Sequence, residues 1–381
     1  MSVERILVLS VKAGAGHLRA AQAVTEALHE QYPRVEVINA DALEYTNAAF
    51  RKGYTGGYEV LVRNLPSVWE RIYKSLEAKP ADSNTKKLAA LWDRLNAKDL
   101  LAFVEGFNPD RIACTHFLPA EALGAQRQKG KLRAPVYTTL TDYDIHSMWI
   151  QDGVDGYFVA SDEMACALRE KGIGSASVDV TGIPILPDFA RDYPSRPTMR
   201  HRLGFDPERL TVLVSAGGFG MMQADEVVRM LAERLPEAQF LAVAGRNADL
   251  EKRLGTLAES CEGRLHAFGF VENMNELMAA SDLAVSKSGG LTTSECLALG
   301  LPMVVFKPIP GQEERNAVYL LEHGAGLWAH TAAQLVYKVA SVFNDPERLA
   351  QMQQAARHLA RPRAAYVIAA RLMGHEPGSA V

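Results

Sequence analysis

Short apolar runs alternate with amphipathic stretches along the whole chain. Runs such as RILVLSV and VEVINAD have the length and composition of buried strands, and helix-like stretches separate them. Strands that alternate with helices predict a parallel sheet covered by helices. The series ends near residue 190, and a second one of similar size begins with TVLVSAGG.

A segment rich in Pro and Arg, FARDYPSRPTMRHRLGF at 189–205, separates the two series and is typical of a linker. We therefore expect an N-terminal domain over 1–190, a C-terminal domain over 191–354, and a final helix within 355–381 that packs back on the N-terminal domain. Both domains are predicted to be α/β and doubly wound, with ligands at the carboxyl ends of the strands in a cleft between the domains.

The composition is that of an ordinary globular protein, since 48% of the 381 residues are hydrophobic and 23% are charged. The four cysteines form no C-x-x-C pair and have no metal-ligand spacing, which favours a reducing compartment. No segment approaches the roughly 20 apolar residues of a membrane span, and the first apolar run is too short for a signal peptide. We expect a cytoplasmic protein, soluble or peripherally bound to a membrane.

The net charge of −4 gives no indication of nucleic-acid binding, but the charge is unevenly distributed. Segment 51–98 carries ten Lys or Arg against five Asp or Glu, and it also contains three tyrosines and two tryptophans. Basic residues interleaved with aromatic ones suit an anionic membrane surface. A solvated helical face with ordinary core aromatics remains an equal alternative.

The first glycine turn follows the strand at 6–11 and precedes a helix at 18–28. Gly14 and Gly16 allow backbone amides to approach a ligand, although Arg19 breaks the dinucleotide pattern G-x-G-x-x-G. His17 lies at the helix start, where the pKa of an imidazole is lowered, so the ring stays neutral and can accept a proton. A capping or core histidine is the alternative interpretation.

The second glycine turn, SKSGGLTTSE at 286–295, follows another strand and opens a helix. Amides, hydroxyls, a lysine and the positive helix end suit a diphosphate, and the residues concerned are Lys287, Gly289, Gly290, Thr292 and Thr293. Carboxylates and amides accept hydrogen bonds from ribose and sugar hydroxyls, and the candidates are Glu295, Gln312, Glu313 and Asn316. The two sets together fit a nucleotide sugar.

These motifs resemble those of the nucleotide-sugar transferases of the GT-B fold, within glycosyltransferase family 28. The chain is most similar to the group of monogalactosyldiacylglycerol synthases and processive diacylglycerol glucosyltransferases. The resemblance extends over nearly the whole chain, through the turn at 14–17, TDYDIHSMWIQDGVDGYFVASDE, VTGIPI, SAGGFG, GFVENMNELMAASD and the donor motif. The block 142–149 and the loop Pro310-Gly311-Gln312-Glu313 are specific to this group.

The resemblance implies a role for each matching residue. The candidate general base at the acceptor site is His17, with Asp142 as the alternative base. If His17 is the base, Asp142 is expected to orient its imidazole. Gly16, His146 and Trp149 are implied for the acceptor. The donor phosphates are assigned to Gly217, Gly218, Lys287, Gly290 and Thr292, and uracil to the backbone of Phe270 and Val271. Ala13, Ala15 and the sequence Ser-Gly-Gly depart from the galactolipid enzymes, which leaves the donor sugar open.

The resemblance also implies an inverting transfer of glucose or galactose from its UDP form to diacylglycerol, at the inner face of the cell membrane and with anionic lipids as partners. No cofactor and no catalytic metal are expected, because amides, Lys287 and a helix dipole can stabilise departing UDP. Another lipid, polyprenyl or soluble acceptor is the main alternative. A UDP-GlcNAc 2-epimerase or a non-catalytic UDP-sugar sensor is a weaker one.

Overall fold

The computed structural model describes residues 4–12, 14–77, 97–174, 177–217 and 223–375. The chain divides into two compact units. Unit 1 comprises 1–187, 310–312 and 361–381, and unit 2 comprises 188–309 and 313–360.

Unit 1 is built on a parallel sheet of six strands in the order β2-β1-β3-β4-β5-β6. The strands are β1 (Arg5–Ser10), β2 (Glu36–Asp41), β3 (Arg111–Cys114), β4 (Val136–Thr139), β5 (Gly156–Val159) and β6 (Val178–Val180). The register pairs Ile6 with Val37 on one side and with Arg111 on the other. Strand β1 therefore lies between β2, an edge strand of the sheet, and β3.

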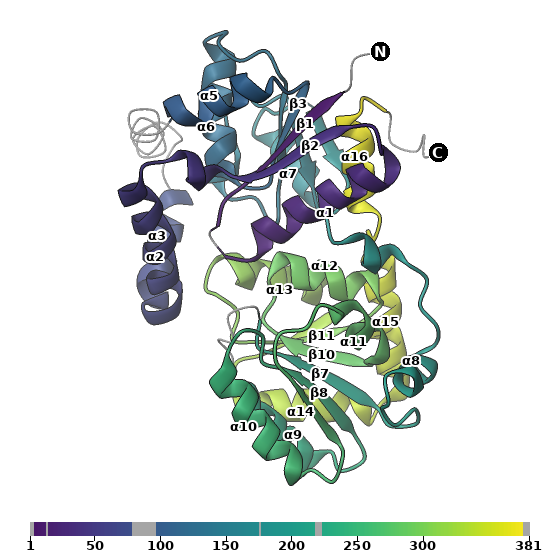
Figure 1. Cartoon of the computed structure of the whole chain (residues 1–381). Coiled ribbons are helices and arrows are strands. Elements are labelled where there is room, and N and C mark those ends of the chain that lie inside the picture. Colours follow the sequence, from purple (N-terminus) through teal and green to yellow (C-terminus); the bar gives the residue numbers. More distant parts are fainter. Residues whose placement is uncertain (1–3, 13, 78–96, 175–176, 218–222, 376–381) are drawn as a thin grey trace. The chain divides into compact units, whose positions relative to one another are not determined.

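Helices cover both faces of this sheet (Figure 1). The helices are α1 (Gly16–Gln31), α2 (Ala48–Asn64), α3 (Pro66–Glu77), α5 (Ala97–Phe107), α6 (Phe117–Gln128), α7 (Asp162–Glu170) and α16 (Ala364–Leu372), with short 3-10 turns at Ala42–Tyr45, Ser147–Trp149 and Pro187–Ala190. Helices α1 and α16 pack together on one face, and α5 and α6 pack on the other.

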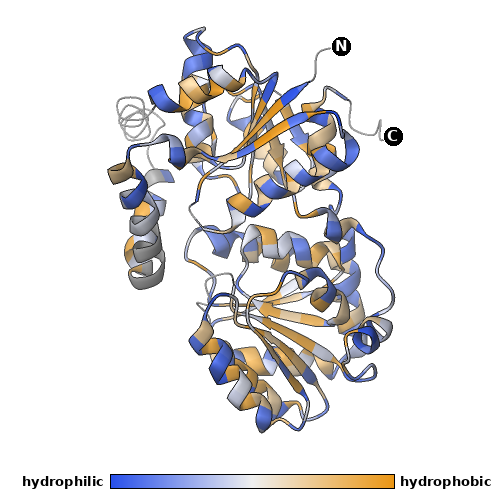
Figure 2. Cartoon of the chain, in the orientation of Figure 1, coloured by the Kyte–Doolittle hydropathy of each residue, from blue (hydrophilic) through white to orange (hydrophobic). Residues whose placement is uncertain are grey.

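The alternation of side chains along β1 explains why both faces must be covered. Leu7 and Leu9 join a core cluster with α5 and α6, while Ile6 and Val8 are equally buried on the opposite face. Figure 2 shows that the strands of both sheets are largely hydrophobic, whereas the helices mix hydrophobic and polar residues. Such a sheet cannot be stable with one face in water.

Helix α16 lies far from α1 in sequence, yet polar contacts fix it within unit 1. Arg371 forms an ion pair with Asp179 of β6, with 2.7 Å between Nη2 and Oδ1. Tyr366 donates a hydrogen bond to Glu30 at 2.5 Å. The carboxyl-terminal helix therefore completes one face of the first sheet.

Unit 2 is built on a second parallel sheet of six strands, in the order β12-β11-β10-β7-β8-β9. The strands are β7 (Thr211–Ser215), β8 (Gln239–Val243), β9 (Leu265–Phe268), β10 (Leu283–Ser286), β11 (Met303–Phe306) and β12 (Gly326–Ala329). Strands β7 and β8 are buried along their entire length. This is the pattern of a sheet covered on both faces.

The helices of unit 2 are α8 (Arg196–Arg202), α9 (Ala224–Arg234), α10 (Ala248–Glu259), α11 (Met274–Ala280), α12 (Gly290–Ala298), α13 (Gln312–Glu322), α14 (Ala332–Phe343) and α15 (Pro346–Leu359). Helices α9, α10 and α14 cover one face, and α11 and α12 lie on the other (Figure 1).

The segment expected to be a linker is partly a helix packed on unit 2. Arg200 of α8 is buried, donates to the carbonyl of Ala280 at 2.9 Å and pairs with Asp282. Arg196 donates to the carbonyl of Gly300 at 2.9 Å. These arginines bind the ends of neighbouring elements of unit 2.

Each sheet has one point where the strand order reverses direction. In unit 1, β2 lies on one side of β1, and the later strands from β3 onward lie on the other side. In unit 2, β8 and β9 lie on one side of β7, and the later strands from β10 onward lie on the other side. Ligands of open α/β sheets bind outside the carboxyl ends of the strands at such points. The two predicted turns lie at these two places, because Gly14 to His17 follow β1 and Lys287 to Gly290 follow β10.

No helix among the described residues is long and apolar enough to cross a membrane.

Candidate functional site

One candidate site surrounds His17 in unit 1. We call the group His17, Thr115, His116, Thr141 and Trp149 the histidine site. Its members follow three neighbouring parallel strands, because His17 begins α1 after β1, Thr115 and His116 follow β3, and Thr141 follows β4. Gly14 has φ of +87°, a left-handed conformation that glycine adopts without strain in the turn before His17.

Hydrogen bonds fix the orientation of the His17 ring. Its Nδ1 lies 2.8 Å from the carbonyl oxygen of Thr115 and 3.1 Å from Oγ1 of Thr141. A carbonyl oxygen can only accept, so Nδ1 carries the hydrogen in this contact. Nε2 then holds the lone pair. It is therefore the ring atom that can take a proton from a substrate hydroxyl.

Burial controls the charge of this ring. Loss of solvation lowers the pKa of His17 to about 4, although the hydrogen bond to the Thr115 carbonyl acts in the opposite direction. The imidazole is therefore neutral at pH 7, as the sequence analysis expected. The physical cause is desolvation rather than the helix start alone.

A second histidine, which sequence reasoning missed, lies directly beside the first. His116 is buried, and its ring centroid lies 4.6 Å from that of His17 in an edge-on arrangement. Its Nδ1 accepts a hydrogen bond of 3.1 Å from the amide of Leu118 at the start of α6. Burial lowers the pKa of His116 well below its ordinary value, and the neighbouring His17 adds to this effect.

Aromatic rings form one wall of the histidine site. Trp149 is buried, with its ring 6.0 Å from His17 and 5.9 Å from Phe117. Gly16, the other small residue expected near an acceptor, is the first residue of α1 and directly precedes His17. An apolar wall beside a neutral base suits an acceptor that is largely hydrocarbon.

Asp142 and His146, both expected at the acceptor site, are buried and hold other parts of unit 1. Asp142 accepts a 3.0 Å hydrogen bond from Nε2 of Gln312. Thr115 and Thr141 contact Nδ1 of His17, and the orientation of the imidazole by Asp142 stays a prediction. His146 contacts the carbonyl of Tyr73 through Nε2 at 3.1 Å and accepts from the amide of Met148 at 3.2 Å. Both ring nitrogens of His146 thus have protein partners.

Another candidate site lies in unit 2 and centres on Lys287. We call the group Gly217, Lys287, Ser288, Glu313 and Asn316 the lysine site. Lys287 pairs with Oε1 of the buried Glu313 at 2.5 Å. The other carboxylate oxygen of Glu313 accepts from the amide of Ile309 at 2.7 Å. Both acceptor atoms of this carboxylate are therefore used in the described structure.

Hydrogen bonds join the ends of β10 and α13 in the lysine site. Ser288 donates its hydroxyl to the carbonyl of Glu313 at 2.6 Å, and the Asn316 amide donates to the Ser288 carbonyl at 3.0 Å. Asn316 is completely buried. These contacts give Asn316 a structural role in shaping the turn, whatever it contributes to a ligand.

Gly217 provides space for the lysine. It follows β7 with φ of +75°, and a Cβ placed there would lie 3.0 Å from Cε of Lys287. A side chain at this position would restrict the lysine and crowd an incoming phosphate. Gly218, also expected near the phosphates, lies outside the described residues.

The start of helix α12 supplies the groups that suit an anion. Gly289 is the residue before the helix and Gly290 is its first residue, so free backbone amides lie at its positive end. Thr292 is partly buried, and the fully buried Thr293 hydroxyl has no hydrogen-bond partner in the described structure. Glu295 lies further along the same helix.

Phe270 and Val271, expected to bind uracil through the backbone, follow β9 in unit 2. Phe270 is 54% exposed, and the guanidinium of Arg246 lies 5.0 Å above its ring. Arg246 follows β8, and sequence reasoning did not single it out.

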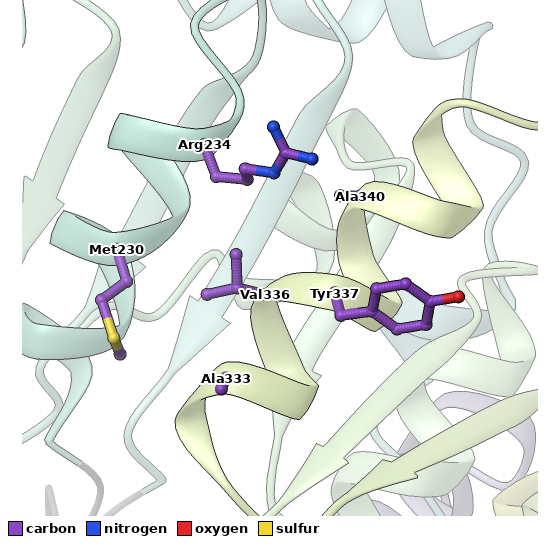
Figure 3. A pocket seen from close by; sticks show the side chains of 6 residues that line it. All are labelled: Met230, Arg234, Ala333, Val336, Tyr337 and Ala340. Atoms are coloured by element: carbon purple, nitrogen blue, oxygen red, sulfur yellow. The ribbon is translucent and has the colours of Figure 1, made fainter.

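A separate groove of about 380 Å³ lies between α9 and α14, away from the predicted site residues (Figure 3). Its lining residues are Met230, Arg234, Ala333, Val336, Tyr337 and Ala340. The Tyr337 side chain is 72% exposed. The groove has the character of an ordinary surface between two helices.

Two family models match the chain, one in each half. Residues 17–185 match the family described as monogalactosyldiacylglycerol (MGDG) synthase. Residues 211–368 match the C-terminal domain of glycosyltransferase family 28. The histidine site falls within the first match and the lysine site within the second.

Curated relatives are similar over nearly the full length. A processive diacylglycerol beta-glucosyltransferase of Bacillus cytotoxicus is 30% identical over 373 residues, which is 96% of this chain and 92% of the relative. A protein of the same description from Bacillus pumilus is 28% identical over 361 residues, or 92% and 90% of the two chains.

Solved structures share the fold at low identity. MurG of Acinetobacter baumannii has a TM-score of 0.64 and 16% identity, covering 97% of this chain and 99% of that one. A UDP-GlcNAc 2-epimerase from Neisseria meningitidis bound to UDP-GlcNAc has a TM-score of 0.60 and 15% identity, covering 98% and 100%. The expected GT-B fold, with two Rossmann-like domains, is confirmed. Because the epimerase shares this fold, fold alone does not distinguish transfer from epimerisation.

Proposed function

The chain belongs to glycosyltransferase family 28, in the group that includes the monogalactosyldiacylglycerol synthases, and we propose that it transfers a hexose from a UDP-sugar to diacylglycerol. The observation that carries the proposal is similarity to diacylglycerol glucosyltransferases over 96% of the chain. The similar part includes the histidine site and the lysine site. The donor is UDP-glucose or UDP-galactose. The product is a β-glycosyl-diacylglycerol.

The proposed chemistry is a single displacement. Nε2 of His17 takes the proton of the acceptor hydroxyl as its oxygen forms a bond to the anomeric carbon. The bond between that carbon and the phosphate oxygen breaks, and UDP leaves with the electron pair. Attack from the side opposite UDP inverts the anomeric carbon.

The lysine site supports departure of UDP. Lys287 and the amides at the start of α12 supply positive charge and donors where charge develops on the diphosphate. Glu313 is held by Lys287 through one carboxylate oxygen and by the Ile309 amide through the other, and the second lone pair of each oxygen can accept a hydrogen bond from a donor hydroxyl. We propose that these protein groups act without a metal, and activity should then persist in EDTA.

The lipid acceptor requires contact with a bilayer, and helix α3 suits that contact. Val68 and Ile72 of α3 are 42% and 37% exposed, and their spacing places them on one helical face. Leu65, which directly precedes the helix, is 47% exposed. Arg71 and Lys74 are exposed on the same helix. An apolar stripe with adjacent cations binds anionic lipid surfaces. We propose peripheral docking of α3 on the cytoplasmic face of the membrane.

The proposal is tested by incubating the protein with each UDP-sugar and with anionic vesicles that contain or lack diacylglycerol. Mass analysis of the lipid fraction should show a hexosyl-diacylglycerol with one of the donors, in the presence or absence of EDTA. If the protein adds a hexose only to a different lipid, that lipid is the acceptor and the diacylglycerol assignment is wrong. Conversion of UDP-GlcNAc without any acceptor would contradict glycosyl transfer and support the epimerase.

A further inference from the structure

Residues 310–312 belong to unit 1, although the residues on both sides belong to unit 2. The following residue, Glu313, belongs to the lysine site, and the amide of the preceding Ile309 donates a hydrogen bond to its carboxylate. Within unit 1, Gln312 is held by its hydrogen bond to Asp142. The contact that holds Gly311 involves a residue that the proposed mechanism does not use.

That residue is Tyr73 of helix α3. Gly311 has φ of +84°, and a Cβ built on it would lie 2.7 Å from Cδ1 of Tyr73 and 3.2 Å from Cε1. The tyrosine ring thus occupies the space where a side chain of residue 311 would project. Direct packing of a ring on a glycine backbone restricts the conformation of the loop.

Tyr73 is itself rigidly placed. It is 6% exposed, and its ring centroid lies 4.3 Å from that of His146. The Tyr73 carbonyl oxygen lies 3.1 Å from Nε2 of His146, whose other nitrogen accepts from Met148. The backbone and the ring of Tyr73 are therefore both held by one buried histidine.

The loop leads directly into the residue that holds Lys287. Glu313 is 4% exposed and bonds to Lys287, to the Ile309 amide and, through its carbonyl, to Ser288. A change in the backbone at 311 and 312 displaces the first turn of α13, which carries this carboxylate. Small displacements of this kind alter the geometry of a charged site.

We propose that Tyr73 is a positioning residue for donor binding. Its ring holds loop 310–312 in the conformation that presents Glu313 to Lys287, and so sets the affinity of the lysine site for a nucleoside diphosphate. The inference rests on the proposed function, because it takes the lysine site to be the donor site. Tyr73 would then affect donor affinity without contacting the donor itself.

The experiment measures UDP binding to the full chain by calorimetry, without lipid. Tyr73→Phe keeps the ring on Gly311, and Tyr73→Ala removes it. Tyr45→Ala is a matched control, because Tyr45 is also in unit 1 and its ring stacks on Phe103 at 4.1 Å. We expect the dissociation constant for UDP to rise about tenfold in Tyr73→Ala and to stay within about twofold in the other two variants.

A double variant tests the contact itself. Gly311→Ala introduces a Cβ that meets the Tyr73 ring, in addition to backbone strain at positive φ. In the Tyr73→Ala background the steric part disappears, so the same glycine substitution should weaken UDP binding less than it does alone. Kinetics should show a raised KM for the UDP-sugar, with kcat at saturating donor largely kept.

The outcomes separate the two proposals. If wild-type protein binds UDP and Tyr73→Ala binds it equally well, the positioning role is wrong and the proposed function stands. Additive effects in the double variant overturn the direct contact. If wild-type protein does not bind UDP, the donor assignment and this inference both fail. Thermal unfolding of each variant shows whether the protein is folded, and so whether weaker binding is a loss of affinity or a loss of folded protein.

Discussion

At the scale of single residues, the account depends on the tautomer and charge of His17. The Thr115 carbonyl fixes the hydrogen on Nδ1, and burial keeps the ring neutral, with a pKa of about 4. A histidine with an ordinary pKa near 6.5 would lose much of its neutral form below pH 6. His17 should stay neutral, and active as a base, well below that pH.

The pH dependence of kcat/KM tests this charge. A base with a pKa of about 4 is almost fully neutral at pH 5.5, so kcat/KM at pH 5.5 should lie within about twofold of its value at pH 7.5. A fall of about tenfold over this range, beginning near pH 6.5, would show that the ring titrates normally. Unfolding curves at both pH values provide the control for stability.

Removing the imidazole tests its role as base. His17→Ala should lower kcat by about 10² to 10⁴, the usual contribution of a positioned general base. UDP affinity should stay unchanged, because the described hydrogen bonds of the imidazole are made to Thr115 and Thr141 and none to the lysine site or to loop 310–312. His116→Ala tests whether the neighbouring ring substitutes for it. If His17→Ala keeps most of its turnover when chemistry limits the rate, the base is a different residue and Asp142 becomes the candidate.

The sequence predicted His17 and Trp149 but not the contacts that His116 and Thr141 make with His17, for a physical reason. A strand, a glycine turn and a helix adjoin one another in the chain, so the position of His17 is a local property. His116 and Thr141 reach it only because β1, β3 and β4 are neighbours, which depends on the strand order. A polar residue after each predicted strand was the available signal, and the THF sequence after β3 contained it.

At the scale of elements, the junction of β10, α12 and α13 forms the lysine site. Lys287→Met should weaken UDP binding by about 10- to 100-fold, the value of a hydrogen bond to a charged group. This change leaves the buried carboxylate of Glu313 without its cation, which threatens folding. The double variant Lys287→Met/Glu313→Gln removes both charges and should fold and still bind UDP weakly.

A matched control for this prediction is Lys252→Met, which removes an exposed lysine from α10 in the same unit. Its dissociation constant for UDP should equal that of the wild type. Equal affinity in the Lys287 variants, measured by calorimetry on folded protein, would contradict the assignment of the diphosphate to this turn.

Helix α3 is the element that we expect to meet the lipid. Replacing Leu65, Val68 and Ile72 with Ser removes the exposed apolar stripe and should reduce partitioning into anionic vesicles by at least about tenfold, because each buried CH₂ contributes about 0.8 kcal/mol. Tyr337→Ser is the control, since this side chain is more exposed but lies on α14. Unchanged sedimentation with vesicles in the triple variant would assign docking to another surface.

The sequence identified segment 51–98 as basic and aromatic but could not separate a lipid surface from a helical core. The structure shows buried and exposed residues at neighbouring positions of helix α3, and contact with lipid stays a prediction. Tyr73 is buried against His146, whereas Ile72, its neighbour in sequence, is 37% exposed. Residues 78–96 of this segment lie outside the described part of the chain.

At the scale of the whole molecule, the alternation of strands and helices was sufficient to predict two parallel sheets. The contacts of residues 310–312 were not predictable, because Gln312 and Asp142 are 170 residues apart in the chain. The linker was also misjudged, since α8 packs on unit 2 through Arg196 and Arg200. Local patterns determine elements, whereas contacts between distant segments depend on the tertiary fold.

The central claim is that sugar leaves UDP only when diacylglycerol accepts it. The direct measurement is the rate of UDP release by purified protein, at a saturating concentration of UDP-glucose or UDP-galactose, as the diacylglycerol fraction of anionic vesicles increases from zero. The account predicts a rate that rises from the background to a plateau with one of the two sugars. A rate that is independent of diacylglycerol with both sugars would contradict it.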